Sequence, residues 1–296
     1  MNGTDIDMTT ATRESPAAFM ALMASGLFWG LIWWPLQFFA QAGLTSTVIS
    51  LTAYALVAVV SLPVIWRERR QWRREWGCLL LIGLCFGCAN YAFTAAMISG
   101  SVVRAMLLFY LLPAWGAIGG RVFLGEQLRP RRVLAVALSL GGVAVILGSS
   151  DIWQSSFSRA DLLALCAGLS YAAAGLANRR ARQIPLASRV LAPFVGCTLL
   201  ALAGTLFVPA VLPPLPLATW GLLAVFAFVW LLGATLMTTY GVTHVPAGRA
   251  SVLQVVELLV AVVSAMMLGG ERLSARDWVG AVLIISATLI ESRSTG

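Results

Sequence analysis

Charged residues are scarce in this sequence, and their scarcity decides which solvent the chain folds in. Only 11% of the 296 residues are charged, whereas 59% are hydrophobic and the mean hydropathy is +0.87. This balance leaves too little polar surface to cover a soluble globule of this length, so it excludes that class. The sequence therefore predicts a membrane protein whose first partner is the lipid bilayer.

Lysine is missing altogether, so the net charge of +8 is carried by 20 arginines against 12 acidic residues. The arginines form short clusters between apolar runs. Clusters of this kind orient membrane helices more often than they bind phosphates. We therefore expect no nucleic-acid partner.

Histidine and cysteine are also rare. His244 is the sole histidine, and the five cysteines all fall in apolar segments. An odd number of cysteines in lipid gives no disulfide framework. Cys85 and Cys88 have a metal-like spacing but no second pair or histidine nearby, so we expect no metal and no cofactor. The sequence has no nucleophile paired with a base and no phosphate-binding glycine loop, which argues against an enzyme and excludes an ATP-driven pump.

Apolar segments fill most of the chain. About 20 such residues are needed to cross the ~30 Å of bilayer hydrocarbon. Segments of this kind predict an all-α integral membrane protein with ten transmembrane helices near 17–39, 46–66, 76–97, 101–123, 131–149, 160–178, 187–209, 217–241, 246–269 and 275–291. Gly26 with Gly30, and Gly83 with Gly87, are pairs of small residues at helical spacing and predict close helix packing.

One stretch of sequence occurs twice. Residues 104–138 recur at 249–283, with Arg104 matching Arg249. A repeat unit this long and this apolar predicts a cytoplasmic tail over 1–15, a five-helix repeat over 16–150 and a second repeat over 151–296. Because five is odd, the second repeat enters the membrane from the opposite side, so the repeats are inverted.

The arginine clusters orient these helices. If the helices alternate, three clusters fall on one side, which the positive-inside rule makes cytoplasmic, and both termini lie there too. The clusters are Arg67, Arg69, Arg70, Arg73 and Arg74; Arg121, Arg129, Arg131 and Arg132; and Arg179, Arg180, Arg182 and Arg189.

Several short motifs together resemble a known family. Gly-Glu-x-Leu occurs once in each half, at Gly125 and Gly270, with Trp29-Gly30 in the first helix and Asn178-Arg179-Arg180 closing the sixth. The pattern resembles the drug/metabolite transporter superfamily, specifically its EamA-type branch, and is similar to bacterial aromatic and neutral amino-acid exporters. The resemblance implies a secondary transporter in the bacterial cytoplasmic (inner) membrane. The sequence departs from the family pattern in the middle of the ninth span, where a Glu-Pro pair is often found but Glu257 is followed by Leu258.

Inverted repeats place the expected substrate site near mid-membrane, where the halves meet and where polar and aromatic side chains are needed. Trp29 and Trp33 share one face of the first helix, and Tyr171 and Asn178 share one face of the sixth. The predicted substrate-binding residues are Trp29, Trp33, Asn90, Tyr91, Tyr110, Tyr171, Asn178, Trp230 and Gln254. The alternatives are that the tryptophans belong to the interfacial belt and that Asn90 and Gln254 only bridge helices.

Glu257 is the predicted proton-coupling residue. A carboxylate near the centre of an apolar helix costs ~2.5–3.5 kcal/mol on insertion scales. It therefore couples protons, pairs with a substrate amine, or stays protonated and hydrogen-bonded in the bundle. Glu126 and Glu271 are interpreted as helix-boundary residues, and Arg104 as a side chain that reaches the membrane interface.

The favoured function is export of small amphipathic metabolites, most readily aromatic and other apolar amino acids, by alternating access. Aromatic faces suit their side chains, amides suit the zwitterion, and the sequence shows no clustered cationic pocket for phosphates. One alternative is export of lipophilic cations by proton exchange. A more distant one is a membrane assembly factor without transport.

Overall fold

The computed structural model describes residues 16–125, 127, 130–147, 157–181, 183–206, 213–245 and 247–292. The predicted tail over 1–15, Glu126 and most of the bridge between the halves lie outside these residues. Every regular element in the described ranges is helical. We call 16–147 the first half of the chain and 157–292 the second half.

The helices follow the predicted ranges within a few residues at most ends. The first half contains α1 (Pro16–Gly30), α2 (Trp33–Gln41), α3 (Ser46–Arg67), α4 (Arg69–Trp72), a short turn of 3₁₀ helix (Arg73–Glu75), α5 (Trp76–Ser99), α6 (Val102–Phe109), α7 (Leu112–Leu124) and α8 (Pro130–Leu147). The second half contains α9 (Arg159–Arg180), α10 (Leu186–Gly204), α11 (Leu217–Val225), the π-helix η2 (Phe226–Leu232), α12 (Gly233–His244), α13 (Ala247–Met267) and α14 (Ala275–Ser292).

Seven helical segments in the described part of the chain are long and apolar enough to cross a membrane. They are Pro16–Gln41, Ser46–Arg67, Arg69–Ser99, Val102–Phe123, Arg159–Arg180, Leu186–Gly204 and Leu217–His244. A further apolar stretch, Val255–Met267, is shorter. The chain is thus a multi-pass, all-helical membrane protein by length and composition, while the number of ten spans stays a prediction.

Two of the membrane segments are interrupted near their middle. The first breaks between Gly30 and Trp33, where the Ile32 amide bonds the Trp29 carbonyl only three residues back, at 3.3 Å. Residues 110 and 111 interrupt the fourth between α6 and α7. A proline in the first turn of α7 fits there, because an amide at that position has no partner within its helix. Broken helices at mid-membrane depth are tolerated where they line a cavity or pack inside the protein.

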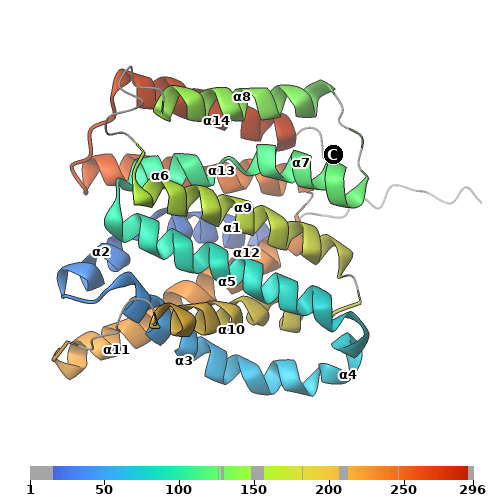
Figure 1. The fold of residues 1–296 in the computed structure, drawn as a ribbon, viewed down its shortest axis with the longest axis vertical. Coiled ribbons are helices and arrows are strands. Elements are labelled where there is room, and N and C mark those ends of the chain that lie inside the picture. The colour runs from blue at the N-terminus through green and yellow to red at the C-terminus, as the bar shows by residue number, and fades with distance from the viewer. Residues whose placement is uncertain are drawn as a thin grey trace, which may run out of the picture.

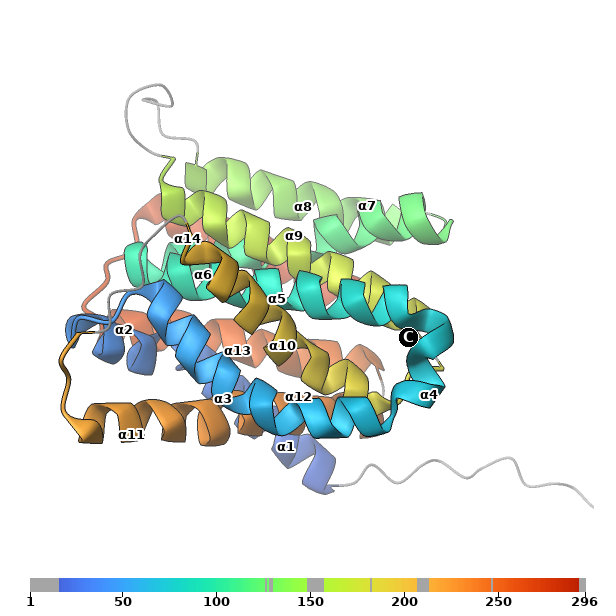
Figure 2. The same ribbon diagram turned by 60° about the horizontal axis from the view of Figure 1, so that its bottom comes forward.

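The helices run side by side as a stack of layers (Figures 1 and 2). α8 and α14 pair at one edge, α3 and α11 lie at the other, and the remaining long helices fill the space between them. The packing joins the two halves: α5 lies against α9 and α10, α3 against α10, and α1 against α12 and α13. The core therefore forms between the halves rather than within either one.

Glycines allow the closest of these crossings. A Cβ atom added to Gly83 would stand 3.1 Å from the Ala192 carbonyl oxygen, and one added to Gly196 would overlap the backbone of Gly83 itself. One added to Gly87 would overlap the backbone at Cys197. The predicted packing role of Gly83 and Gly87 is confirmed, because α5 and α10 touch backbone to backbone at these residues.

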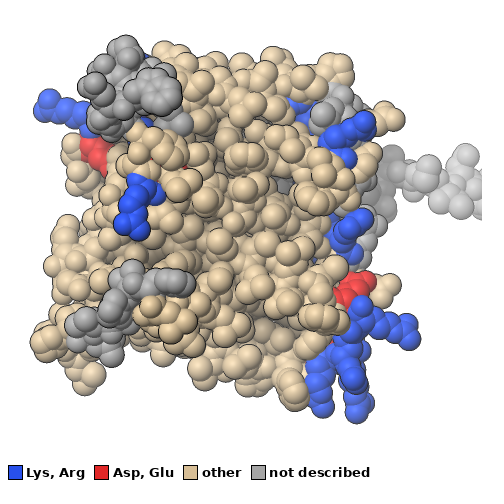
Figure 3. Space-filling model, in the orientation of Figure 1, with Lys and Arg blue, Asp and Glu red and all other residues tan. Residues whose placement is uncertain are grey.

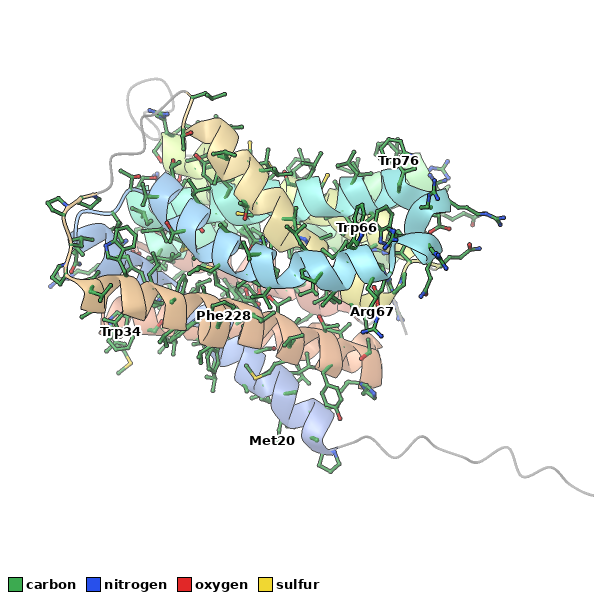
Figure 4. All side chains as sticks on the ribbon, turned by 90° about the horizontal axis from the view of Figure 1, so that it is seen from below. Met20, Trp34, Trp66, Arg67, Trp76 and Phe228 are labelled. Carbon is green, nitrogen blue, oxygen red and sulfur yellow. The ribbon has the colours of Figure 1, made fainter. Side chains whose placement is uncertain are left out.

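The surface has the distribution expected in a bilayer. Charged side chains gather towards two opposite edges, with a broad uncharged band between them (Figure 3). Trp66 and Trp76 are 64% and 61% exposed beside Arg67 at one end of the bundle, and Trp34 is 59% exposed towards the other (Figure 4). Tryptophans at the edges of an apolar band are typical of the two membrane–water interfaces.

Candidate functional site

A cavity of about 620 Å³ lies between the two halves of the chain. This volume is within the range of small-molecule sites, roughly 300–1,000 Å³. The cavity extends to the end of the bundle at which α8 and α10 begin and α9 ends, the right-hand end in Figure 1. Six of the predicted site residues line it: Trp29, Asn90, Tyr110, Tyr171, Asn178 and Glu257.

Aromatic rings packed largely edge to face form one wall of the cavity. The Tyr171 ring meets Phe86 edge to face, with centroids 5.0 Å apart, and meets Phe109 in the same way at 5.5 Å. Phe93 extends the wall, 5.0 Å from Phe109. These rings come from α5, α6 and α9, so the wall spans both halves. Rings held in this way present an apolar surface against which an aromatic or aliphatic side chain can pack.

Glu257 faces this cavity from α13. Its carboxyl group hydrogen-bonds with the Tyr110 hydroxyl at the break between α6 and α7. α1 packs directly behind it, since a Cβ atom on Gly30 would stand 2.7 Å from the Glu257 carbonyl oxygen. The small residue therefore lets α1 pack closely against the backbone of α13 at the position of Glu257.

Three arginines surround the mouth of the cavity. Arg132 comes from the start of α8, Arg179 from the end of α9 and Arg189 from the start of α10. An Arg189 guanidinium nitrogen donates to the Asn178 side-chain oxygen at 3.1 Å. The expectation that no cationic cluster exists is wrong. These residues are far apart in sequence, and only the folding of three helix ends to one place groups them. We refer to this end as the arginine end.

Four threonines of α12 also line the cavity: Thr235, Thr238, Thr239 and Thr243. Sequence reasoning missed them, although the signal was present. Their spacing of three, one and four residues puts all four on one face of a helix. In an otherwise apolar segment, such a polar face marks a surface turned away from lipid.

Three predicted site residues are not among those lining the cavity. The Trp33 indole donates to the Ser264 hydroxyl at 2.9 Å, and the Trp230 indole to the Phe28 carbonyl at 2.8 Å. The Tyr91 hydroxyl bonds Thr47 at 2.9 Å. Each therefore bridges helices instead. The break after Gly30 ends the helical face on which Trp29 and Trp33 were expected together, which separates their directions. The side chain of the remaining candidate, Gln254, lies outside the described residues.

Polar contacts join the two halves at the opposite end of the bundle. Glu271 accepts hydrogen bonds from the Ser101 hydroxyl and the Val102 amide, both at 2.7 Å, and from the Val103 amide at 3.2 Å. Its carboxylate thus caps the first turn of α6. Gln37 adds a bond to the Met97 carbonyl at 2.8 Å within the first half. Glu271 is therefore more than a helix boundary, and we call this the Glu271 end.

The repeated Gly-Glu pair explains how Glu271 reaches α6. Gly270 has φ of +67°, a left-handed conformation that glycine adopts readily at helix ends, and Gly125 has +68°. The Glu271 amide then bonds the Ala265 carbonyl six residues back, at 3.2 Å. Arg104 also links the halves: its Nε lies 2.9 Å from the Asp161 carboxylate, and the pair joins the first turns of α6 and α9.

Comparison with known proteins yields relatives described only as transporters. An uncharacterized transporter of Pseudomonas aeruginosa is 29% identical over 170 residues, which is 57% of this chain but 46% of that protein. The uncharacterized transporter YyaM of Bacillus subtilis is 25% identical over 248 residues, or 79% of this chain and 80% of the relative. A transporter of Archaeoglobus fulgidus is 25% identical over 68% of this chain and 71% of its own length.

A solved crystal structure resembles the whole fold. It has a TM-score of 0.60 at 17% identity and covers 94% of this chain and 97% of that one. At this identity the likeness bears on the fold alone. The model of the EamA-like transporter family matches twice, over residues 16–148 and 158–293. These two matches take in the cavity-lining helices of both halves, and the chain therefore belongs to the EamA-like transporter family.

Proposed function

We propose that this transporter exports small zwitterions with apolar side chains, most readily aromatic and branched amino acids. The observation that carries the proposal is the chemistry of the cavity. One chamber combines the aromatic wall around Tyr171, the carboxyl group of Glu257 and the arginines of the mouth. A free amino acid has an apolar side chain that suits the rings, a carboxylate that suits the guanidinium groups and an ammonium group that suits the threonine face of α12, while Glu257 is available for proton coupling.

We also propose that the chain crosses the cytoplasmic membrane ten times, as inverted repeats over 16–150 and 151–296. The two family matches fall one in each of these ranges. Helix packing supports two equivalent repeats, because α1 lies against α12 and α13 of the second half, and its counterpart α9 lies against α5 and α6 of the first. Five spans in each repeat make the repeats inverted. The arginine end is then cytoplasmic, and both termini lie on that side. The cavity accordingly loads from the cytoplasm.

Cysteine labelling tests this topology. Single cysteines at Arg70 and Arg131, in a background with the five natural cysteines replaced, should resist an impermeant thiol reagent applied to intact cells. Cysteines at Pro214 and Ser274 should react, because these exposed positions lie in loops assigned to the outer face. Permeabilised cells serve as the control, since all four should then react. Reaction at Arg70 or Arg131 in intact cells would contradict the inverted arrangement.

Counterflow in proteoliposomes tests the substrate. Vesicles loaded with unlabelled phenylalanine should take up labelled phenylalanine, and leucine and tryptophan should compete. Tyr171→Leu should weaken competition by aromatic amino acids roughly 2- to 12-fold, the equivalent of one lost aromatic contact of ~0.5–1.5 kcal/mol. Tyr240→Leu is the matched control, because Tyr240 is exposed and is not among the cavity-lining residues.

The same assay separates the alternatives. Competition by tetraphenylphosphonium without competition by amino acids would replace the proposal with export of lipophilic cations. Exchange of no solute at all would favour a membrane factor without transport.

A further inference from the structure

The threonines of α12 give one wall of the cavity a defined hydrogen-bonding character. Each donates its hydroxyl hydrogen to the helix itself. Thr235 bonds the Leu231 carbonyl at 2.7 Å, Thr238 the Ala234 carbonyl at 2.8 Å and Thr239 the Thr235 carbonyl at 2.8 Å. A carbonyl oxygen only accepts, and a hydroxyl has a single hydrogen. In this arrangement each hydroxyl therefore offers the cavity its oxygen as an acceptor.

One N–H group inside the protein already uses this wall. The Trp29 indole donates to the Thr238 oxygen at 3.1 Å, while that oxygen continues to bond its own helix. Trp29 itself lines the cavity. Thr238 is thus occupied, and Thr235 and Thr239, one helical turn apart, remain to face a ligand. Both line the cavity, and Glu257 adds a further acceptor.

The positively charged hydrogen-bond donors of the cavity lie elsewhere, at the mouth. Arg132, Arg179 and Arg189 all line the cavity there. The Nε of Arg189 is buried and has no hydrogen-bond partner among the described residues. The cavity is thus polarised along its length. Its mouth offers donors that suit a carboxylate, and the α12 wall offers acceptors that suit an ammonium group.

We propose that Thr235 and Thr239 bind the substrate amine through their hydroxyl oxygens, with the substrate carboxylate directed to the arginine end. This proposal rests on the proposed function, because it concerns the same cavity, and it adds the specificity rule and the orientation. A wall built to accept N–H bonds rejects an analogue that lacks them, because the acceptors are then buried without a partner. Amino acids should bind and their deaminated analogues should not.

Three matched probes test the rule on the purified full-length protein in lipid nanodiscs. L-phenylalanine carries both charged groups, 2-phenylethylamine only the amine and 3-phenylpropionate only the carboxylate. Binding is measured by calorimetry. The parent should bind phenylalanine at least about tenfold more tightly than phenylpropionate, because both present a carboxylate to the arginine end and only phenylalanine presents charged N–H donors to the α12 wall. Phenylethylamine, which lacks the carboxylate, reports the amine contact alone.

Valine replaces threonine at nearly constant shape. Thr235→Val and Thr239→Val should each weaken binding of the two amines about tenfold and change phenylpropionate binding less than about twofold. Thr239→Ser keeps the hydroxyl and should restore amine binding. Thr198→Val is the matched control, because Thr198 bonds its own helix at 2.8 Å in the same way but is not a cavity-lining residue.

The outcomes separate this proposal from the proposed function. If the valine variants lose affinity for all three probes equally, the threonines have only a packing role and the proposal is overturned. Unchanged affinity for the two amines would also overturn it. If amino acids exchange but the parent protein binds phenylpropionate as tightly as phenylalanine, the proposed function stands and the amine rule is rejected. Valine-sensitive binding of phenylethylamine without amino-acid counterflow would do the reverse. Failure of all three probes to bind would overturn both.

Discussion

Gly196→Leu should abolish folded protein. The Cβ atom of any residue at 196 would overlap the Gly83 carbonyl group, and the contact is with backbone, which cannot rotate away. α5 and α10 would have to separate along the crossing that also holds Gly87. Overpacking a core side chain costs ~1–3 kcal/mol, and a backbone clash exceeds that range. We expect loss of the monodisperse peak in size-exclusion chromatography and a large fall in melting temperature.

Gly221→Leu is the control for this prediction. Gly221 also lies in a membrane helix, α11, but a Cβ atom there would meet nothing within 4 Å. Its yield and melting temperature should match those of the parent within experimental scatter. A Gly196→Leu protein that melts within a few degrees of the parent would show that the two helices are not in backbone contact.

Glu257→Gln should remove concentrative, pH-dependent transport while exchange of substrate down its gradient continues. Glutamine keeps the size of the side chain and can still bond the Tyr110 hydroxyl, but it cannot release a proton. With one proton moved per substrate, a pH difference of one unit supports about tenfold accumulation. The Glu257→Gln variant should show no accumulation driven by the pH difference. Proteoliposomes with an imposed pH gradient measure accumulation, and counterflow in the same vesicles measures exchange.

The same variant distinguishes the three roles of the acid. An acid that pairs with the substrate amine would lose both accumulation and exchange when converted to Gln. A permanently protonated structural acid would lose neither. Glu257→Gln transport equal to the parent in rate and pH profile would therefore reject proton coupling and leave a passive carrier. Tyr110→Phe serves as the companion change, since it removes the hydroxyl partner but leaves the titratable group in place.

Sequence reasoning located the helices well because their signals are local. Length and apolarity define a segment, and boundaries follow from residues such as Ser101, whose hydroxyl accepts from the Arg104 amide at the start of α6. Interruptions within a segment were missed. The break after Gly30 depends on the Phe28 carbonyl finding Trp230 in the other half of the chain. No local pattern contains that partner.

The same distinction applies to the candidate site. Periodicity placed Tyr171 and Asn178 correctly on one face, because α9 is continuous between them. It joined Trp29 to Trp33 across a break that it could not detect. The arginines of the mouth were assigned to orientation alone, since their proximity is tertiary. The threonines of α12 were predictable from spacing. They were overlooked because a single threonine in a membrane helix can bond its own helix and does not by itself indicate a cavity-lining position.

The Glu271 carboxylate at the start of α6 affects the relative populations of the two conformations of such a carrier. Under the proposed alternating access the Glu271 end opens, so the amides of Val102 and Val103 would lose that partner and water would replace it. The difference between a carboxylate cap and water is ~0.5–2 kcal/mol. This shifts the populations of the two states about 2- to 30-fold, whereas reversing a 1:99 ratio takes ~5.5 kcal/mol. The contact is thus strong enough to favour one resting state and weak enough for the bound solute to overcome it.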